Sequence, residues 1–531
     1  MDARSAGAAD GARVARRAGE AEGANGARAA TRAPGAKRAA DVAPLHPRGL
    51  RGVGLASVEG WALVAAGLAW LAFASDGGVV RGLAAGGVGC VTLGAGIGVL
   101  LYPGDLRIVS FGALASLAGL AVAALGAVAF GFATSLGLVA LAVVGWLASG
   151  RASLAWTSPT PGVPEREDSL RLASKVAMDE ALLASFHLRL DFPTGARLEQ
   201  IVRETLALRE RHAALGSREN PLAVHRTPPP LDAPRLAPAR AAGRDFEHLA
   251  FESEWEPQVG EPGRERWLSH TANRTAHAYV VRSDPSAPWL VAINGYRMGL
   301  APIDLRLFDP RLYVDRMGLN LAIPVLPLHG PRRIGRFSGD GYLDGDPVAF
   351  FHAECQAIWD LRRIVSWIRA QGGERIGVLG LSLGGYNCAL LASVEEGLAC
   401  AIAGIPVADF SRILWTHGPP WLMRAYEKAG LPREEIASLL APVAPLALDP
   451  RVPREGRAVF AGTGDRIVPP EHQRDLIAHW DPPARCWYQG GHVTFRLDPE
   501  VERLVRGVLA ARLAPAASGA GAAAPRRVAD A

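Results

Sequence analysis

The sequence predicts an α/β fold, a mostly parallel sheet with helices on both faces, preceded by a helical transmembrane region. From about residue 245 to residue 512, short apolar runs alternate with helix-like stretches, which is typical of a parallel sheet. Residues 108–150 contain no charged side chain, and these 43 residues are more than a pair of soluble core helices needs. The total of 531 residues leaves room for both regions.

The composition excludes several other classes of protein. With 49% hydrophobic and 21% charged residues, the chain is neither disordered throughout nor fibrous. The net charge of +5 is small, and ten of the basic residues lie in the first 51 positions, so we expect no nucleic-acid partner. The five cysteines are scattered and form no C-x-x-C pair, which argues against a disulfide framework. We expect no metal and no cofactor.

The two ends of the chain are expected to be disordered. Residues 1–51 are a basic Ala/Gly/Arg run without an apolar period, and residues 513–531 are rich in Ala. Neither segment can bury enough apolar surface to offset its chain entropy.

Residues 52–150 are expected to form transmembrane helices, four in number. Two spans lie within residues 108–150, and a third covers residues 83–103. The fourth, at residues 60–75, has only 16 uncharged residues and needs residues 52–58 to cross the hydrocarbon. A region of three spans is therefore the alternative. The many Gly, Ala and Ser residues fit close helix packing in lipid.

The charges beside the spans predict the orientation in the membrane. Basic residues precede the first span, namely Arg32, Lys37, Arg38, Arg48 and Arg51. They place the N-terminus in the cytoplasm, and four spans return the rest of the chain to the same side. A cytoplasmic C-terminal domain would suit the unpaired cysteines. Three spans would place that domain outside instead.

Residues 151–244 are expected to form a juxtamembrane region of helices and a Pro-rich linker. Residues 168–190 and 195–215 have apolar side chains at helical spacing. We interpret them as a structural helical hairpin packed against the following domain; a membrane-proximal lid or access channel is the alternative. Residues 220–243 are rich in Pro and are interpreted as a linker or extended segment.

Residues 245–512 carry the α/β pattern. Helix-like stretches at residues 349–370 and 386–396 separate some of the apolar runs. The expected strands are residues 276–282, 289–293, 319–326, 375–379, 400–405, 458–461 and 486–488. Because these elements alternate, the strands should be mostly parallel and buried on both faces.

One serine stands in a context that favours nucleophilic chemistry. The segment Gly380-Leu-Ser382-Leu-Gly384-Gly385 follows an apolar run and precedes a helix-like stretch. A sharp turn between a strand and a helix holds a serine in a strained conformation with its hydroxyl exposed, and flanking glycines avoid collisions across the turn. A serine hydroxyl needs a base to take its proton.

Candidate partners for Ser382 follow later in the chain. Asp465 lies in Gly462-Thr-Gly-Asp-Arg-Ile-Val-Pro-Pro470 after one expected strand, and His492 lies in Gly490-Gly-His after the next. Asp409 is an alternative acid, although we favour it as a helix N-cap. The order Ser, Asp, His with these flanking motifs resembles the α/β-hydrolase superfamily over most of residues 245–512.

The resemblance implies a catalytic triad and an oxyanion hole. Ser382 would be the nucleophile, His492 the general base and Asp465 the acid that orients it. The backbone N–H of Leu383 would be one oxyanion donor, and the loop Asn294-Gly-Tyr296 would supply the second, which we assign to Tyr296.

A further loop carries basic residues beside the expected site. His329-Gly-Pro-Arg-Arg333 loosely resembles a segment of proteins like α/β-hydrolase domain-containing protein 18. His329, Arg332 and Arg333 are therefore candidate substrate-binding residues that would hold an anionic group. The alternatives are a solvated basic loop and, for His329, a role as the base.

These observations predict a membrane-anchored serine hydrolase that cleaves carboxylic esters through an acyl-enzyme. The expected partners are a lipophilic ester, such as a lipid or acyl ester, and membrane lipid; the oligomeric state stays open. Two alternatives remain: an acyltransferase or thioesterase with the same triad, and a non-catalytic membrane scaffold with an inert hydrolase fold.

Overall fold

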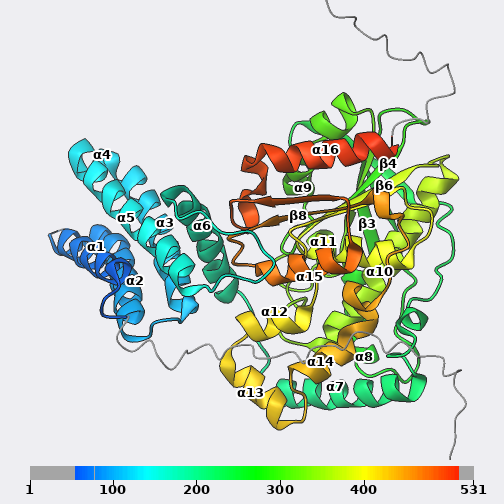
Figure 1. Ribbon diagram of the computed structural model, residues 1–531, viewed down its shortest axis with the longest axis horizontal. Helices are drawn as coiled ribbons and strands as arrows, with labels where there is room; N and C mark the ends of the chain where they lie inside the picture. Colours follow the sequence, from blue (N-terminus) through cyan, green and yellow to red (C-terminus); the bar gives the residue numbers. More distant parts are fainter. Residues whose placement is uncertain (1–53, 77, 514–531) are drawn as a thin grey trace, which may run out of the picture. The chain divides into compact units, whose positions relative to one another are not determined.

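The computed structural model describes residues 54–76 and 78–513 (Figure 1). The expected tail at residues 1–51 lies outside the described residues, as do the basic residues that precede the first span and all of the expected tail at residues 513–531 except Leu513, which ends the last helix.

Four helices of the described chain are long and apolar enough to cross a membrane, judged by length and composition. They are α1 (Val58–Ser75), α2 (Val79–Leu101), α3 (Leu106–Leu125) and α5 (Phe132–Trp156). The short helix α4 (Ala127–Phe130) precedes α5. A Cβ atom on Gly67 would lie 2.5 Å from the backbone nitrogen of Leu93, so the small residue lets α1 and α2 approach closely. The number and the positions of these helices agree with the expected four spans. Their insertion in a membrane remains a prediction.

The next two helices do not form the expected hairpin. Helix α6 (Leu170–His187) packs against α3 and α5, whereas α7 (Gly195–Leu215) packs against α10 (Pro347–Ala370) and α14 (Arg433–Leu440). Both helices contact the α/β region, as expected, but the predicted pairing of the two helices is wrong, because each packs its apolar face against other helices. Helix α6 presents small alanines to the bundle, and α7 inserts larger side chains into the core of the α/β region.

Nine strands in the described part of the chain form one sheet in the order β1-β2-β3-β5-β4-β6-β7-β8-β9. The strands are β1 (Arg235–Ala241), β2 (Arg244–Glu252), β3 (Thr275–Val281), β4 (Trp289–Ile293), β5 (Asn320–Val325), β6 (Ile376–Leu381), β7 (Cys400–Gly404), β8 (Arg457–Gly462) and β9 (Ala484–Tyr488). In this sheet order, the pairs β1–β2, β2–β3 and β3–β5 are antiparallel, and all pairs from β5–β4 to β8–β9 are parallel.

The first two strands correct the sequence analysis. Strand β1 lies inside residues 220–243, the expected linker, and β2 begins at residue 244. Pro238 sits in β1, at the edge of the sheet, where a missing N–H is tolerated. The Pro content therefore indicates an edge strand here and not only a linker.

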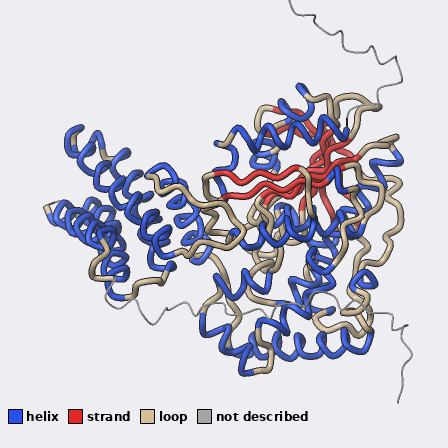
Figure 2. The backbone as a smooth tube through the Cα atoms, in the orientation of Figure 1, coloured by secondary structure: helices blue, strands red, loops and turns tan. Residues whose placement is uncertain are grey.

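Helices cover both faces of the sheet (Figures 1 and 2). Within β4, Val291 and Ile293 point into one hydrophobic core and Leu290 and Ala292 into the other. The first core includes side chains of α10, α11 (Leu383–Val394) and α15 (Pro470–Trp480). The second includes side chains of α9 (Ala301–Leu307) and α16 (Pro499–Leu513). Burial on both faces explains why the parallel strands are almost wholly apolar.

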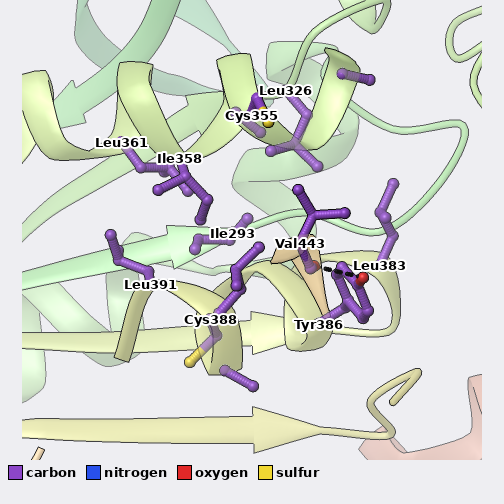
Figure 3. Close-up of a cluster of buried hydrophobic side chains, with 14 of the residues drawn as sticks. Ile293, Leu326, Cys355, Ile358, Leu361, Leu383, Tyr386, Cys388, Leu391 and Val443 are labelled. Atoms are coloured by element: carbon purple, nitrogen blue, oxygen red, sulfur yellow. Dashed lines mark hydrogen bonds between the residues drawn. The ribbon is translucent and has the colours of Figure 1, made fainter. Parts of the chain in front are cut away.

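Helix α11, which follows β6, is held firmly in the first core (Figure 3). Every residue of α11 is buried. The Tyr386 hydroxyl donates a hydrogen bond of 2.6 Å to the carbonyl oxygen of Val443, and Figure 3 shows this contact near Leu383. The core therefore fixes the helix that follows the turn after β6.

Three helices separate β7 from β8, namely α12 (Phe410–His417), α13 (Pro420–Lys428) and α14. The mostly parallel sheet, the helices on both faces and the sharp turn after β6 define the α/β-hydrolase fold, as the sequence predicts.

Candidate active site

Ser382 occupies a strained turn between β6 and α11. Its φ of 59° and ψ of −115° are rare for a residue with a side chain. The turn depends on its glycines: a Cβ atom on Gly380 would lie 1.9 Å from the carbonyl oxygen of Gly384, and one on Gly384 would lie 2.1 Å from that of Ile293. Only glycine fits these contacts, so the motif is explained by close backbone packing.

Ser382 and His492 line the same cavity, which has a volume of about 430 Å³. Its walls are mainly apolar and come from α6, α10, the helices α12 and α14, and the loops after β4 and β9. Apolar side chains that line it include Leu182, Leu183, Phe186, Phe350, Phe410, Leu414, Ile436 and Leu440. A mainly apolar cavity with a few polar groups at one place is typical of a small-molecule site.

Asp465 and His492 form a buried pair. The Nδ1 atom of His492 lies 2.7 Å from Oδ2 of Asp465, while Oδ1 of Asp465 accepts hydrogen bonds from the backbone N–H groups of Ile467 and Val468. Burial lowers the pKa of His492, but the charge and hydrogen bond of Asp465, together with Asp179, outweigh it and raise that pKa above its usual value.

The pair also fixes the tautomer of the histidine. A carboxylate can only accept, so Nδ1 of His492 carries the hydrogen that it donates to Asp465. In the neutral ring this leaves Nε2 as a proton acceptor. His492 and Ser382 line one cavity, and the role of His492 as the base remains a prediction.

The two expected oxyanion donors lie beside the serine. Leu383 is the first residue of α11, where backbone N–H groups have no acceptor within the helix. The loop after β4 passes close by, because a Cβ atom on Gly295 would lie 3.5 Å from Cβ of Ser382. Tyr296 follows and lines the cavity. Both donor assignments remain predictions.

The expected substrate-binding loop does not reach the cavity that the described residues form. Arg332 is fully buried, with an ion pair of 2.9 Å to Asp360 and hydrogen bonds to the carbonyl oxygens of Val325 and Asn273. The prediction that Arg332 binds substrate is therefore wrong, because its guanidinium group is buried and paired with protein groups in the core.

The neighbours of Arg332 also lie away from the cavity walls. His329 is buried, its Nδ1 lies 2.8 Å from the carbonyl oxygen of Pro327, and burial lowers its pKa to about 4. Arg333 is exposed and donates to the carbonyl oxygen of Gly330. Neither position supports the expected anion site.

Asp409 caps α12, as the sequence analysis favours, through its acceptance of the N–H groups of Ser411 and Arg412. Two other acids, Asp179 and Glu180 on α6, were not expected from the sequence; they are fully buried and contact the loops of Asp465 and His492. The available signal is two adjacent carboxyl groups within residues 176–184, which are otherwise apolar.

Comparison with known proteins gives the family. No family model matches the chain. It is 39% identical over 357 residues to the uncharacterized protein MT2702 of Mycobacterium tuberculosis strain CDC 1551, covering 65% of this chain and 84% of the relative. The uncharacterized protein Rv2627c of strain H37Rv is 38% identical over the same share of both chains. The chain therefore belongs to the same family as these mycobacterial proteins.

Solved structures with similar chains include esterases and other α/β hydrolases. The acetyl xylan esterase from Paenibacillus sp. R4 is 15% identical with a TM-score of 0.39, covering 60% of this chain and 96% of its own. The α/β hydrolase GrgF from Penicillium sp. sh18 is 17% identical with a TM-score of 0.33, covering 45% and 95%. The fold assignment rests on the sheet and turn of this chain itself.

Proposed function

We propose that the chain is a membrane-anchored serine hydrolase that cleaves carboxylic esters of lipophilic acyl groups. The observation that carries the proposal is that Ser382, in its strained turn, lines the same mainly apolar cavity as His492, which is paired with the buried Asp465. These residue types in this chain order are those of a Ser-His-Asp triad.

The reaction would run in two halves. The Ser382 oxygen attacks the ester carbonyl while Nε2 of His492 takes its proton, and Asp465 stabilises the imidazolium that forms. Backbone N–H groups of Leu383 and Tyr296 would hold the oxyanion. His492 then gives the proton to the leaving alcohol. Water attacks the acyl-enzyme, His492 takes the proton of the water, and the free acid leaves as Ser382 regains its hydrogen.

The walls of the cavity support a lipophilic substrate. Leu182 and Phe186 of α6 and the apolar side chains of α12 and α14 would surround an acyl chain. Burial of apolar surface contributes about 25 cal/mol per Å², so such walls favour a hydrocarbon over a polar acyl group. The four apolar helices would keep the enzyme where lipophilic esters concentrate.

Labelling with a fluorophosphonate probe tests the nucleophile and the base. The wild-type protein is expected to become labelled, and Ser382→Ala and His492→Ala are expected to lose the label. Ser286→Ala changes an exposed loop serine and serves as the matched control. Labelling that survives in Ser382→Ala would reject the proposed nucleophile, and an unlabelled wild type would favour an inert fold.

Product analysis separates hydrolysis from acyl transfer. With a long-chain ester in detergent micelles, a hydrolase releases free acid even when an alcohol is added in excess. If the acyl group is instead recovered mainly on the added alcohol, the protein is a transferase with the same machinery.

A further inference from the structure

Asp179 of α6 holds the backbone of the loop that carries His492. Its Oδ2 atom accepts hydrogen bonds of 2.6 Å from the N–H of His492 and 3.1 Å from the N–H of Arg466, and its Oδ1 atom accepts one of 3.3 Å from the N–H of Val493. Arg466 directly follows Asp465 in sequence. One carboxylate therefore connects the loop of the base with the loop of its acid.

The next residue, Glu180, connects the acid loop to the helical bundle. Its Oε1 atom accepts from Nε of Arg466 at 3.0 Å and from the hydroxyl of Ser153 on α5 at 2.5 Å. Its Oε2 atom accepts from the hydroxyl of Ser110 on α3. Glu180 is fully buried, so its charge is balanced by Arg466 and by hydrogen bonds instead of by water.

The Gly490-Gly491 pair before His492 leaves room for Asp179. A Cβ atom on Gly491 would lie 2.5 Å from Oδ2 of Asp179 and 2.7 Å from its Cγ. The φ of Gly491 is −91°, which any residue adopts, so the requirement for glycine here is space and not conformation. Lys175, one turn earlier on α6, donates a hydrogen bond of 2.5 Å to the carbonyl oxygen of Gln489.

We propose that Asp179 is a positioning residue that sets the geometry and charge of the His492–Asp465 pair from outside the sheet, on a helix that also packs against the bundle. This inference rests on the proposed serine-hydrolase function. Asp465 holds the ring of His492, and Asp179 holds its backbone. When the ring becomes cationic during the reaction, the two carboxylates stabilise it together.

Asp179 affects the pKa of His492, so its role can be measured from a pH profile. Burial and the charge of Asp465 raise the pKa of Asp179 to about 7. Other ionisable groups that face the two residues are Tyr488, His417 and the Arg466–Glu180 ion pair. Burial raises the pKa of Tyr488 and lowers the pKa of His417 to about 4, so both are neutral. In its ionised form Asp179 is a second negative charge beside His492, which adds to that of Asp465 and raises the pKa of the histidine.

The variant Asp179→Asn tests the proposal through the rate of fluorophosphonate labelling as a function of pH. We expect the rate to fall by up to about 100-fold, the loss that a displacement of about 1 Å causes in an oriented reaction. We also expect the acidic limb of the profile to move to lower pH, because the loss of a neighbouring negative charge lowers the pKa of His492. Asp191→Asn removes an exposed carboxylate just beyond α6 and is the matched control.

Asp179→Glu keeps the charge but lengthens the side chain by one methylene group. Its labelling should also slow, while the acidic limb stays at the wild-type pH. If Asp179→Asn fails to fold, a wild-type rate in Asp179→Glu still overturns the proposal. A purely structural role would lower the rate in both variants without moving the limb in either.

Hydrogen exchange separates this inference from the proposed function. In Asp179→Asn, peptides that contain residues 465–468 and 490–494 should exchange their amide hydrogens faster than in the wild type, whether or not the protein is catalytic. Unchanged exchange in both peptides would overturn the positioning role. An unlabelled wild type with faster exchange in the variant would reject the hydrolase function and keep the structural link.

Discussion

Replacement of Gly491 by Ala gives a sharp test of the contact between α6 and the His492 loop. The added Cβ atom would lie 2.5 to 2.8 Å from three atoms of the Asp179 carboxylate, below any normal contact distance. Either the loop or the carboxylate must shift, and overpacking of this kind costs about 1–3 kcal/mol. The backbone of Gly491 is extended, so no strain from φ adds to this value.

The expected result is a lower melting temperature together with slower labelling of Ser382. At roughly 2–4 °C per kcal/mol for a domain of this size, the midpoint should fall by roughly 2–12 °C. The shifted carboxylate should also weaken its hydrogen bonds to the N–H groups of His492 and Val493. The labelling rate should then fall by more than the loss of folded protein explains. The assay is fluorophosphonate labelling in detergent, normalised to the folded fraction.

Gly507→Ala is the matched control. Gly507 lies in α16, and a Cβ atom added there would meet no other atom within 4 Å, so an alanine should leave stability unchanged or raise it by up to about 1 kcal/mol. If Gly491→Ala has the melting temperature and labelling rate of the Gly507→Ala control, the Asp179 carboxylate does not pack closely against the His492 loop. The proposed positioning role of Asp179 would then lack this contact.

Four further predictions follow from the site. Asp465→Asn should slow labelling by about ten-thousand-fold, because an amide can hold the His492 ring in the wrong tautomer; a loss below tenfold would argue for another acid. The wild-type labelling rate should decline as the pH falls through the pKa of His492, which Asp465 and Asp179 raise above the usual histidine value, since only the neutral ring accepts a proton; a pH-independent rate would contradict this. Arg332→Ala should reduce the free energy of unfolding by about 3–5 kcal/mol, because Asp360 keeps an uncompensated charge, yet leave the labelling rate of the folded protein unchanged. In sealed vesicles that expose the cytoplasmic side, protease should digest the α/β region; digestion only from the opposite side would contradict the four-span topology.

The parallel part of the fold is predictable because burial on both faces leaves a strong signal. The runs that form β4, β6 and β7 are wholly buried and apolar, and the sequence pattern places them to within two residues. Strands β1 and β2 lack this signal. Strand β1 is mostly exposed and contains a proline, so its residues look like a linker until the sheet edge that they pair with is known.

Some residues of the candidate site could also be predicted from the sequence, and others could not. Ser382, Asp465 and His492 are each marked by local sequence, since glycines and strand ends surround them, and the structure brings the last two within 2.7 Å. Arg332 shows the limit of such reasoning. A basic loop after a strand suggests anion binding, but its partner Asp360 lies on α10, and only the fold reveals that the two charges neutralise each other in the core.

Asp179 could not be assigned from sequence because its partners are backbone groups more than 280 positions away. The loops of Asp465 and His492 both depend on α6 for these hydrogen bonds, and α6 also packs against the apolar helices. One face of α6 packs against α3 and α5, where a Cβ atom on Gly150 would lie 1.9 Å from the carbonyl oxygen of Ala173. The same helix supplies Leu182 and Phe186 to the cavity. A displacement of α6 relative to α3 and α5 would therefore move the Asp465 loop, the His492 loop and this part of the cavity wall together, so under the proposed function we expect changes at the contacts of α6 with α3 and α5 to alter the labelling rate of Ser382.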